Sequence, residues 1–335
     1  MSEGRKRGSR RGGRGKDGRR PLVAALDLGT NNCRLLIASA ARNGQLRVVD
    51  SFSRIVRLGE GVAATGHFSE AAIGRTVAAL KMCAQHIGNH PRVRVRAVGT
   101  EACRRAANID LLLARAKEEA GIALEVISPE EEARLAAIGC APLVDPEAAG
   151  SLIFDIGGGS TETIWMKRDG RSALSAVAAI STSVGVVSLA EAAHGVIDRA
   201  GYERMRADMI SLFAAVKAQM DGKGVFDCPT HHLLGTSGTV TTLAGIALGL
   251  ARYDRGKVDG SWHDCADIES VIDRLVSLDV PGRAAIGCVG PDRADLIVPG
   301  CAIFAAIHHH WPCLQLRVAD RGLREGILRE LLARH

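Results

Sequence analysis

Two acidic residues flank a glycine-rich turn in the middle of the chain, in the segment LIFDIGGGSTETIW at residues 152–165. An apolar run ends at Asp155, and three glycines and two hydroxyl residues separate this acid from Glu162. Carboxylates are hard oxygen ligands that suit Mg²⁺, and glycines can take positive φ and bring backbone N–H groups close to an anion. The segment predicts a site for phosphate and Mg²⁺, although a hairpin turn with solvated acids is an equal alternative for this segment alone. The predicted ligands are Asp155 and Glu162 for the metal and Gly157, Gly158, Gly159, Ser160 and Thr161 for the anion.

The same arrangement occurs near the start of the chain, in LVAALDLGTNNCRLLIA at residues 22–38. An apolar strand again ends in an acid, Asp27, and the small residues Gly29, Thr30 and Asn31 precede a second apolar strand. The two acids lie 128 positions apart, from 27 to 155, which suggests a duplicated α/β half-domain with two facing loops. Two such loops can hold the two sides of a phosphate chain in a cleft between domains, a usual location for a binding site.

The length and composition fit a two-domain protein. The chain has 335 residues and is 47% apolar but only 3% aromatic, so its cores must consist mainly of aliphatic side chains. No apolar run reaches the roughly 18 residues that span a bilayer, and the N-terminus has no apolar signal-peptide region. The nine cysteines contain no CxxC pair. They indicate reduced core thiols in a cytoplasmic protein without a zinc site.

The positive charge is concentrated at the N-terminus. Residues 1–20 contain seven Arg and two Lys against one Glu and one Asp, a net charge of +7, while the whole chain carries +6. A Gly/Arg-rich segment of this kind cannot bury enough apolar surface to fold. We expect a disordered tail that attracts RNA or another polyanion loosely and in a salt-dependent manner.

Strands and helices alternate along the rest of the chain, which predicts an α/β fold. The clearest helix runs from Ser69 to Gly88, where apolar residues recur on one face between a Ser N-cap and a glycine stop. The further predicted helices span 108–120, 201–219, 238–248, 267–277, 299–310 and 322–332, and the predicted strands lie within 22–52 and at 93–100, 123–127, 151–156, 161–166, 174–180, 231–236 and 314–319.

One helix start carries an acid that capping does not explain. In VISPEEEARLAAIG, Ser128 is a good N-cap, Pro129 suits the first helical position, and Glu131 completes a capping box at N3. Glu132 follows at N4, a position that often holds an apolar residue packed against the one before the cap, here Ile127. A carboxylate there is either solvated or directed at a ligand.

At this point the motifs resemble those of the exopolyphosphatase/guanosine pentaphosphate phosphohydrolase (Ppx/GppA) family. That family belongs to the actin/Hsp70/sugar kinase superfamily, whose α/β fold consists of duplicated ribonuclease-H-like domains around a cleft. The matching segments run in order from residue 22 to about residue 330: ALDLGTNN, GTEACRRA, EEEARLAAIG, FDIGGGSTE, LLGTSGTV, VPG and ADRGLREGIL. Longer members carry a further helical HD-type region after this point, which is not present in this sequence.

The resemblance implies Mg²⁺-dependent release of the terminal phosphate of polyphosphate, or of the 5′-γ-phosphate of guanosine pentaphosphate. It implies Glu132 as the catalytic base, Arg104 as an arginine that meets substrate phosphates, and Asp27, Asp155 and Glu162 as acids at the metal and water site. Gly157 to Thr161 match the phosphate-binding loop, and Ser237 in GTSGT belongs either to a third anion loop or to a simple strand-to-helix turn. The implied domains are residues 21–135, joined in one arrangement by the last helix at 321–335, and residues 136–320.

Two other functions fit parts of the same pattern. A kinase or ATPase of the superfamily would share the loops but would need an adenine pocket and, for a kinase, an acceptor base. A non-catalytic sensor would bind alarmone or polyphosphate and signal through the basic tail. The number of acids disfavours the sensor, because binding a polyanion does not require carboxylates nearby. The sequence leaves open which phosphate substrate is used and whether the chain forms a homodimer.

Overall fold

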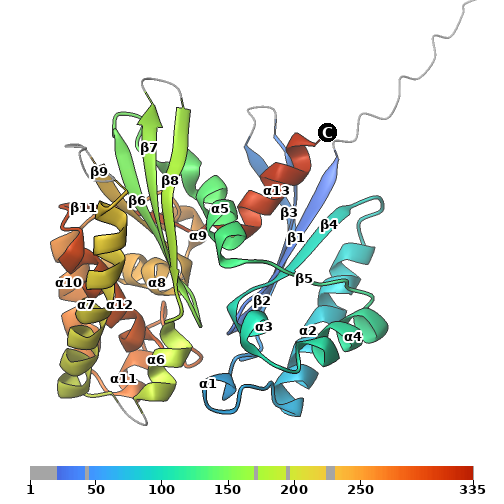
Figure 1. Cartoon of the computed structure of the whole chain (residues 1–335), viewed down its shortest axis with the longest axis horizontal. Coiled ribbons are helices and arrows are strands. Elements are labelled where there is room, and N and C mark those ends of the chain that lie inside the picture. Colours follow the sequence, from blue (N-terminus) through green and yellow to red (C-terminus); the bar gives the residue numbers. More distant parts are fainter. Residues whose placement is uncertain (1–20, 42–44, 170–172, 194–196, 224–230, 335) are drawn as a thin grey trace, which may run out of the picture.

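The computed structural model of the chain describes residues 21–41, 45–169, 173–193, 197–223 and 231–334. Two lobes lie side by side, each a β-sheet covered by helices (Figure 1). We refer to the lobe that contains the first sheet as the first domain and to the other as the second domain. The predicted basic tail, residues 1–20, lies outside the described residues.

The first domain contains a five-stranded sheet in the order β3-β2-β1-β4-β5. Strands β1, β2 and β3 form an antiparallel meander, and β4 and β5 run parallel to β1. Helix α2 begins where the Ser69 hydroxyl accepts the Ala72 N–H, as the sequence predicts. The elements are β1 (Leu22–Leu28), β2 (Asn32–Ala40), β3 (Leu46–Ile55), α1 (Val62–Thr65), α2 (Glu70–Gly88), β4 (Arg94–Gly99), α3 (Glu101–Arg105), α4 (Ile109–Ala120) and β5 (Glu125–Val126).

The second domain repeats this strand order. Its sheet is β10-β11-β9-β6-β7-β8, in which β6, β7 and β8 form the antiparallel meander and β9 and β11 run parallel to β6. Apart from the edge strand β10, this is the topology of the first sheet, so the predicted duplication of a ribonuclease-H-like fold is confirmed. The strands are β6 (Gly150–Ile156), β7 (Thr161–Asp169), β8 (Ala173–Thr182), β9 (His231–Thr236), β10 (Trp262–Asp264) and β11 (Gln315–Ala319).

Helices of the second domain cover one face of this sheet, and a single core of aliphatic and aromatic side chains lies beneath them. Phe154 of the sheet packs against Phe304 of α12 in that core, with ring centroids 6.0 Å apart. The helices are α6 (Val186–Ala192), α7 (Arg199–Asp221), α8 (Ser237–Ala247), α9 (Arg255–Val258), α10 (Cys265–Ser277), α11 (Val280–Ala284) and α12 (Ile297–His310).

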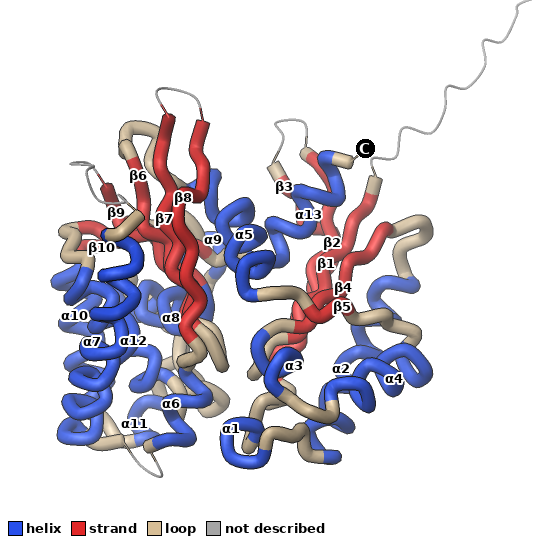
Figure 2. The backbone as a smooth tube through the Cα atoms, viewed as in Figure 1, coloured by secondary structure: helices blue, strands red, loops and turns tan. Residues whose placement is uncertain are grey.

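Two helices, α5 (Pro129–Cys140) and α13 (Leu323–Ala333), lie together between the sheets (Figure 2). Helix α13 shares a buried cluster with β1 and β2, and α5 shares one with β6 and β7. The two helices approach closely at glycines, since a Cβ at Gly326 would lie 2.0 Å from the Leu135 carbonyl oxygen. This close contact holds the two helices against each other in the space between the domains.

Among the described residues, no helix has the length and apolar character needed to cross a membrane. Eight cysteines are described as free thiols, and all except Cys313 are buried, as expected for core residues.

Candidate active site

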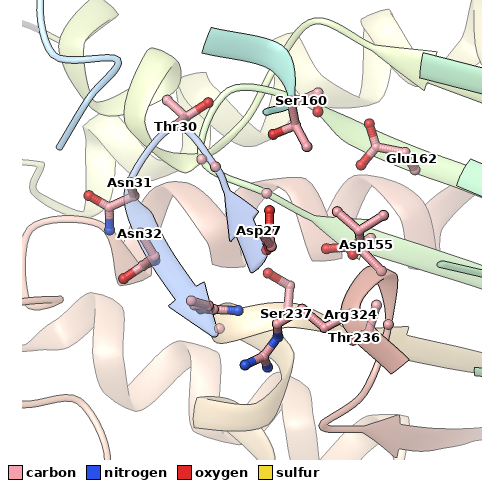
Figure 3. Close-up of a pocket in the computed structure, with 18 of the residues that line it drawn as sticks. Asp27, Thr30, Asn31, Asn32, Asp155, Ser160, Glu162, Thr236, Ser237 and Arg324 are labelled. Atoms are coloured by element: carbon pink, nitrogen blue, oxygen red, sulfur yellow. The ribbon is translucent and has the colours of Figure 1, made fainter. Parts of the chain in front are cut away.

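A cleft of about 320 Å³ lies between the domains, where the β1–β2 and β6–β7 turns face each other. Figure 3 shows Asp27 and Asp155 at the ends of their strands, with Thr30 and Asn31 on one side and Ser160 and Glu162 on the other. The structure thus brings both predicted loops and their acids into one cavity.

Backbone hydrogen bonds hold the β1–β2 turn: one lies within the turn, and the others come from the segment that follows β3. The Gly29 N–H donates to the Asn32 carbonyl at 2.9 Å, and the Thr30 carbonyl accepts the Gly59 N–H at 2.9 Å. The Asn31 carbonyl accepts N–H groups from Val56 and Arg57. Its side-chain Oδ1 is buried without a partner among the described residues, and a buried polar atom of this kind indicates an interaction with a ligand or bound water.

The β6–β7 turn presents amide groups to the cleft. The carbonyls of Gly157 and Gly158 accept N–H groups from Val186 and Val187 at the start of α6. The N–H groups of Gly158 and Gly159 have no protein acceptor among the described residues, which suits them to an anion. The expectation that these glycines use positive φ is wrong, because none of the three has a left-handed φ.

Close approach explains the glycines instead. A Cβ at Gly159 would lie 2.7 Å from the Thr30 hydroxyl oxygen, and one at Gly158 would lie 3.0 Å from the Thr30 Cβ. A Cβ at Gly157 would lie 2.9 Å from the Ser160 carbonyl oxygen. Side chains at Gly158 and Gly159 would push the two turns apart, whereas one at Gly157 would disrupt its own turn.

Thr161 does not line the cleft, contrary to the prediction that it binds phosphate. It is buried, and its hydroxyl donates to the Val184 carbonyl at 2.7 Å. Ser160 and Ser237 do line the cleft. Ser237 begins α8 with φ 79°, a left-handed value that is uncommon for a side-chain-bearing residue, and its side chain forms a hydrogen bond that lowers the pKa of Asp155.

Three acids at the cleft floor resist ionisation. Burial raises the pKa of Asp27, and the charges of Arg34 and Arg324 partly oppose this. Burial raises the pKa of Asp155 to about 6 and that of Glu162 to about 7. The neighbouring Asp155 also raises the pKa of Glu162, whereas hydrogen bonds from Ser160 and Ser181 lower it. Like charges held close together in a protein interior favour a bound cation or a shared proton.

Glu132 lies on the cleft from the first turn of α5 and is directed at a partner rather than solvated. Its Oε2 accepts a hydrogen bond from Arg104 at 2.8 Å. Burial raises the pKa of Glu132 well above its ordinary value, and Glu162 raises it further, while Arg104 opposes both. The charge on Glu162 therefore disfavours ionisation of Glu132.

Arg104 is not among the residues that line the cleft, whereas the family resemblance implies contact with substrate phosphates. Its guanidinium donates to Glu132, to Glu101 at 2.9 Å and to the Ile127 carbonyl at 2.9 Å. These three acceptors occupy most of its donors and hold it behind Glu132. In this structure Arg104 positions a carboxylate.

Glu131 is held differently from its neighbour. The Ser128 hydroxyl accepts the Glu131 N–H at 3.2 Å, so the predicted N-cap is confirmed. The reciprocal half of the predicted capping box is absent here, because the Glu131 carboxylate pairs with Arg134 at 2.7 Å and Arg96 at 3.0 Å. These ion pairs lower the pKa of Glu131, so the two adjacent acids have opposite shifts.

Arginines that sequence reasoning did not single out also line the cleft, among them Arg34, Arg293 and Arg324. Arg34 lies directly opposite Asp27 in the β1–β2 pair, a register that the short turn could have indicated. Arg293 and Arg324 come from distant parts of the chain, and no local pattern indicates them. Guanidinium groups of this kind suit the oxygens of phosphates.

The fold and cleft define a two-domain α/β protein of the duplicated ribonuclease-H-like class, with a cleft between its domains that glycines, arginines and acids line. Residues 36–335 match the model of the Ppx/GppA phosphatase family, and the chain belongs to that family. This confirms the resemblance found in the sequence.

Individual relatives support the same assignment. The chain is 32% identical to exopolyphosphatase 2 of Mycobacterium tuberculosis, over 91% of this chain and 97% of that protein. It is 29% identical to the guanosine-5′-triphosphate,3′-diphosphate pyrophosphatase of Aeromonas salmonicida, over 93% of this chain and 60% of that protein. The crystal structure of the Aquifex aeolicus Ppx/GppA family member superposes with a TM-score of 0.76 at 31% identity, covering 94% of this chain and 98% of that one.

Proposed function

We propose that this protein is a Mg²⁺-dependent phosphohydrolase that releases the terminal phosphate of inorganic polyphosphate, of guanosine pentaphosphate, or of both. The observation that carries the proposal is the convergence of unpaired glycine amides, arginines and acids with raised pKa in one cleft. The names of the relatives, an exopolyphosphatase and a guanosine pentaphosphate pyrophosphatase, support this substrate class.

The terminal phosphate would lie between the two turns. The Gly158 and Gly159 N–H groups, whose residues line the cleft, can donate to its oxygens. The Ser160 hydroxyl lines the cleft beside them but is engaged with Glu162. Arg34 and Arg293 supply positive charge from the other walls. Phosphoryl transfer depends mainly on such positioning and on neutralisation of charge, so no covalent intermediate on the protein is required.

The acids fit a magnesium ion that shares its coordination with substrate. Asp27 and Asp155 have raised pKa values, and neither forms an ion pair among the described residues. No group of three or more His, Cys, Asp and Glu in the described part of the chain could hold a metal, but Mg²⁺ is often held by one or two carboxylates together with phosphates and water. Asp27 and Asp155 would be its ligands, Glu162 would lie beside it, and the ion would neutralise charge on the phosphate oxygens.

Glu132 would act as the general base. In its ionised form it accepts a proton from the attacking water, whose oxygen forms a bond to the terminal phosphorus. The bond from that phosphorus to the bridging oxygen breaks, and the shortened chain leaves with the electron pair. Arg104 would keep the Glu132 carboxylate in place through the 2.8 Å hydrogen bond, and the raised pKa increases the proton affinity of this base.

The proposal is tested by incubating the purified chain with end-labelled long-chain polyphosphate and with γ-labelled guanosine pentaphosphate, each with Mg²⁺ and with EDTA. We expect labelled phosphate in the presence of Mg²⁺ and none with EDTA. Turnover of ATP without cleavage of either substrate would favour a kinase or ATPase instead. Tight binding of both substrates without any release of phosphate would favour a non-catalytic sensor.

Three further expectations remain predictions. The basic tail would add loose, salt-dependent contact with polyanions, including RNA, and it lies outside the described residues. A cytoplasmic location and a homodimer are the other two.

A further inference from the structure

A second hollow adjoins the cleft on the outer side of β3. It has a volume of about 630 Å³ and lies between the end of β3 and the segment 289–293 of the second domain. Asn32, Ser53 and Arg293 line both this hollow and the cleft. We call it the distal groove, and it is continuous with the cleft through these three residues.

The distal groove is strongly basic. Arg54, Arg57, Arg75 and Arg293 line it, against a single acid, Asp292. Arg54 is exposed and forms no ion pair among the described residues, and its guanidinium carbon lies 5.4 Å from the Phe52 ring centroid. An arginine without a carboxylate partner beside a cleft that is itself lined by arginines favours a bound anion.

Three of the four arginines, those of the first domain, differ in how far existing contacts occupy them. Arg75 is occupied, because it donates to the Val56 carbonyl at 2.9 Å, to the Arg57 carbonyl at 3.3 Å and to Glu60 at 2.9 Å. Arg57 forms one ion pair with Asp295 of the second domain at 3.4 Å, and both side chains are nearly half exposed. Arg54 and Arg57 are therefore the groups best able to bind a ligand.

The backbone that carries these arginines is tied to the cleft. Val56 and Arg57 donate their N–H groups to the Asn31 carbonyl, and Gly59 donates to the Thr30 carbonyl. Arg57 itself has φ 46°, a left-handed value that costs energy for a residue with a side chain. The surrounding hydrogen bonds hold this conformation, so the groove arginines keep a fixed place relative to the cleft turns.

We propose that the distal groove binds the internal phosphates of a polyphosphate chain whose terminal phosphate lies in the cleft. This inference rests on the proposed function and extends it to the selection of chain length. The groove contains no aromatic side chain among its described lining residues, so it offers no ring on which a nucleobase would stack. A linear polyanion, which carries charge along its whole length, suits several arginines in one groove better than a nucleoside does.

The test compares two arginines on the same strand. Arg54→Ser removes one positive charge from the groove, and Arg47→Ser removes one from an exposed position at the other end of β3. For long-chain polyphosphate at low salt we expect Arg54→Ser to raise KM about two- to fivefold, as expected for one exposed ion pair of up to ~1 kcal/mol. Its kcat should not change, and Arg47→Ser should match the wild type.

Tripolyphosphate is the short-chain control, because its phosphates would be held in the cleft alone. Its KM should be the same in Arg54→Ser and the wild type. An equal rise in KM for both substrates would overturn the proposal, and so would an unchanged KM for long chains. Guanosine pentaphosphate distinguishes the other source of phosphates: a rise in its KM equal to that for long polyphosphate would assign the groove to the nucleotide and overturn the polyphosphate assignment.

A second pair of variants separates ligand binding from domain contact. Arg57→Asn removes the charge with a residue that tolerates positive φ, and Asp295→Asn breaks the same interdomain ion pair while keeping the arginine. We expect only Arg57→Asn to weaken binding of long polyphosphate. Equal weakening by both variants would attribute the effect to domain contact and overturn the proposal.

Direct binding keeps this test separate from the proposed function. Titration of long polyphosphate in EDTA reports occupancy without turnover. If the wild type releases no phosphate from any substrate, the proposed function fails, whereas weaker binding of long chains by Arg54→Ser than by Arg47→Ser would still support the groove.

Discussion

The β1–β2 and β6–β7 hairpins have the same form but place different side chains opposite their acids. In the strand register of the first hairpin Asp27 lies opposite Arg34, and in that of the second Asp155 lies opposite Glu162. Each partner follows its acid by seven positions, so the difference is a substitution at one equivalent position. The first hairpin is electrostatically balanced, whereas the second accumulates negative charge.

This difference divides the chemistry between the two halves. Arg34 lowers the pKa of both Asp27 and Asp155 and can face a phosphate oxygen. Glu162 instead raises the pKa of Glu132, the proposed base. A duplicated fold thus provides two similar turns, and the side chain opposite the acid is an arginine in the first and a glutamate in the second.

The largest effect is expected at Glu132, which lies on the acidic side of this comparison. Glu132→Gln should lower kcat by about 10²–10⁴-fold while leaving binding of polyphosphate largely intact, because a general base contributes that much. Glu131→Gln is the matched control: its carboxylate pairs with Arg96 and Arg134 away from the cleft. Steady-state kinetics would contradict the assignment if both variants lost activity to a similar extent.

Binding of Mg²⁺ should depend on one acid from each hairpin. Asp27→Asn and Asp155→Asn should each raise the Mg²⁺ concentration for half-maximal activity by at least about tenfold, since even changes around a metal ligand cost 10–100-fold in affinity. Titration of Mg²⁺ at saturating polyphosphate measures this. An unchanged midpoint in both variants would place the metal elsewhere in the chain.

The different charges of the two hairpins also predict that variants of each will shift the pH dependence of kcat in opposite directions. Activity requires ionised acids, so it should decline as pH falls. At limiting Mg²⁺ the decline should approach the metal-free pKa values of about 7 for Glu162 and about 6 for Asp155, because a bound cation lowers both values. Arg34→Gln should move the decline in kcat to higher pH by about half a unit to one unit, because it removes the charge that lowers the pKa of Asp155. Glu162→Gln should move the decline to lower pH, because it removes a charge that raises the pKa of Glu132. Shifts in the same direction would show that the two hairpins act alike.

Part of this arrangement could be predicted from the sequence because the signals were local. A strand, an acid and a glycine turn occur twice, and this repetition indicates both the duplicated fold and the facing loops. The alternation of side chains along a strand was also available: Glu162 faces the cleft, so its neighbour Thr161 must point to the other side, where it bonds to Val184.

Other features depend on tertiary contacts that no local pattern encodes. Gly158 and Gly159 of the second turn lie against Thr30, which is more than a hundred residues away. Arg293 and Arg324 reach the cleft from the far end of the chain. Arg104 is held behind Glu132 by acceptors from two segments, a position that only the packed structure shows.

The smallest expected effect concerns stability. It compares Glu162, whose pKa is raised, with Glu131, whose pKa is lowered. Burial raises the pKa of Glu162 from 4.5 to about 7, so between these values the folded state binds more protons at this site than the unfolded state does. The free energy of unfolding therefore falls as pH rises through this window. In EDTA at pH 8, Glu162→Gln should raise Tm by about 2–4 °C, which corresponds to roughly 1 kcal/mol in a domain of this size, and at pH 4 the difference should vanish.

Glu131 has a lowered pKa, so its ion pairs stabilise the fold above the ordinary pKa of the acid, and Glu131→Gln should lower Tm at pH 8. Thermal unfolding curves of the two variants at both pH values measure the effect, and a lower Tm for Glu162→Gln at pH 8 would show that the acidic hairpin is compensated by contacts other than a bound cation.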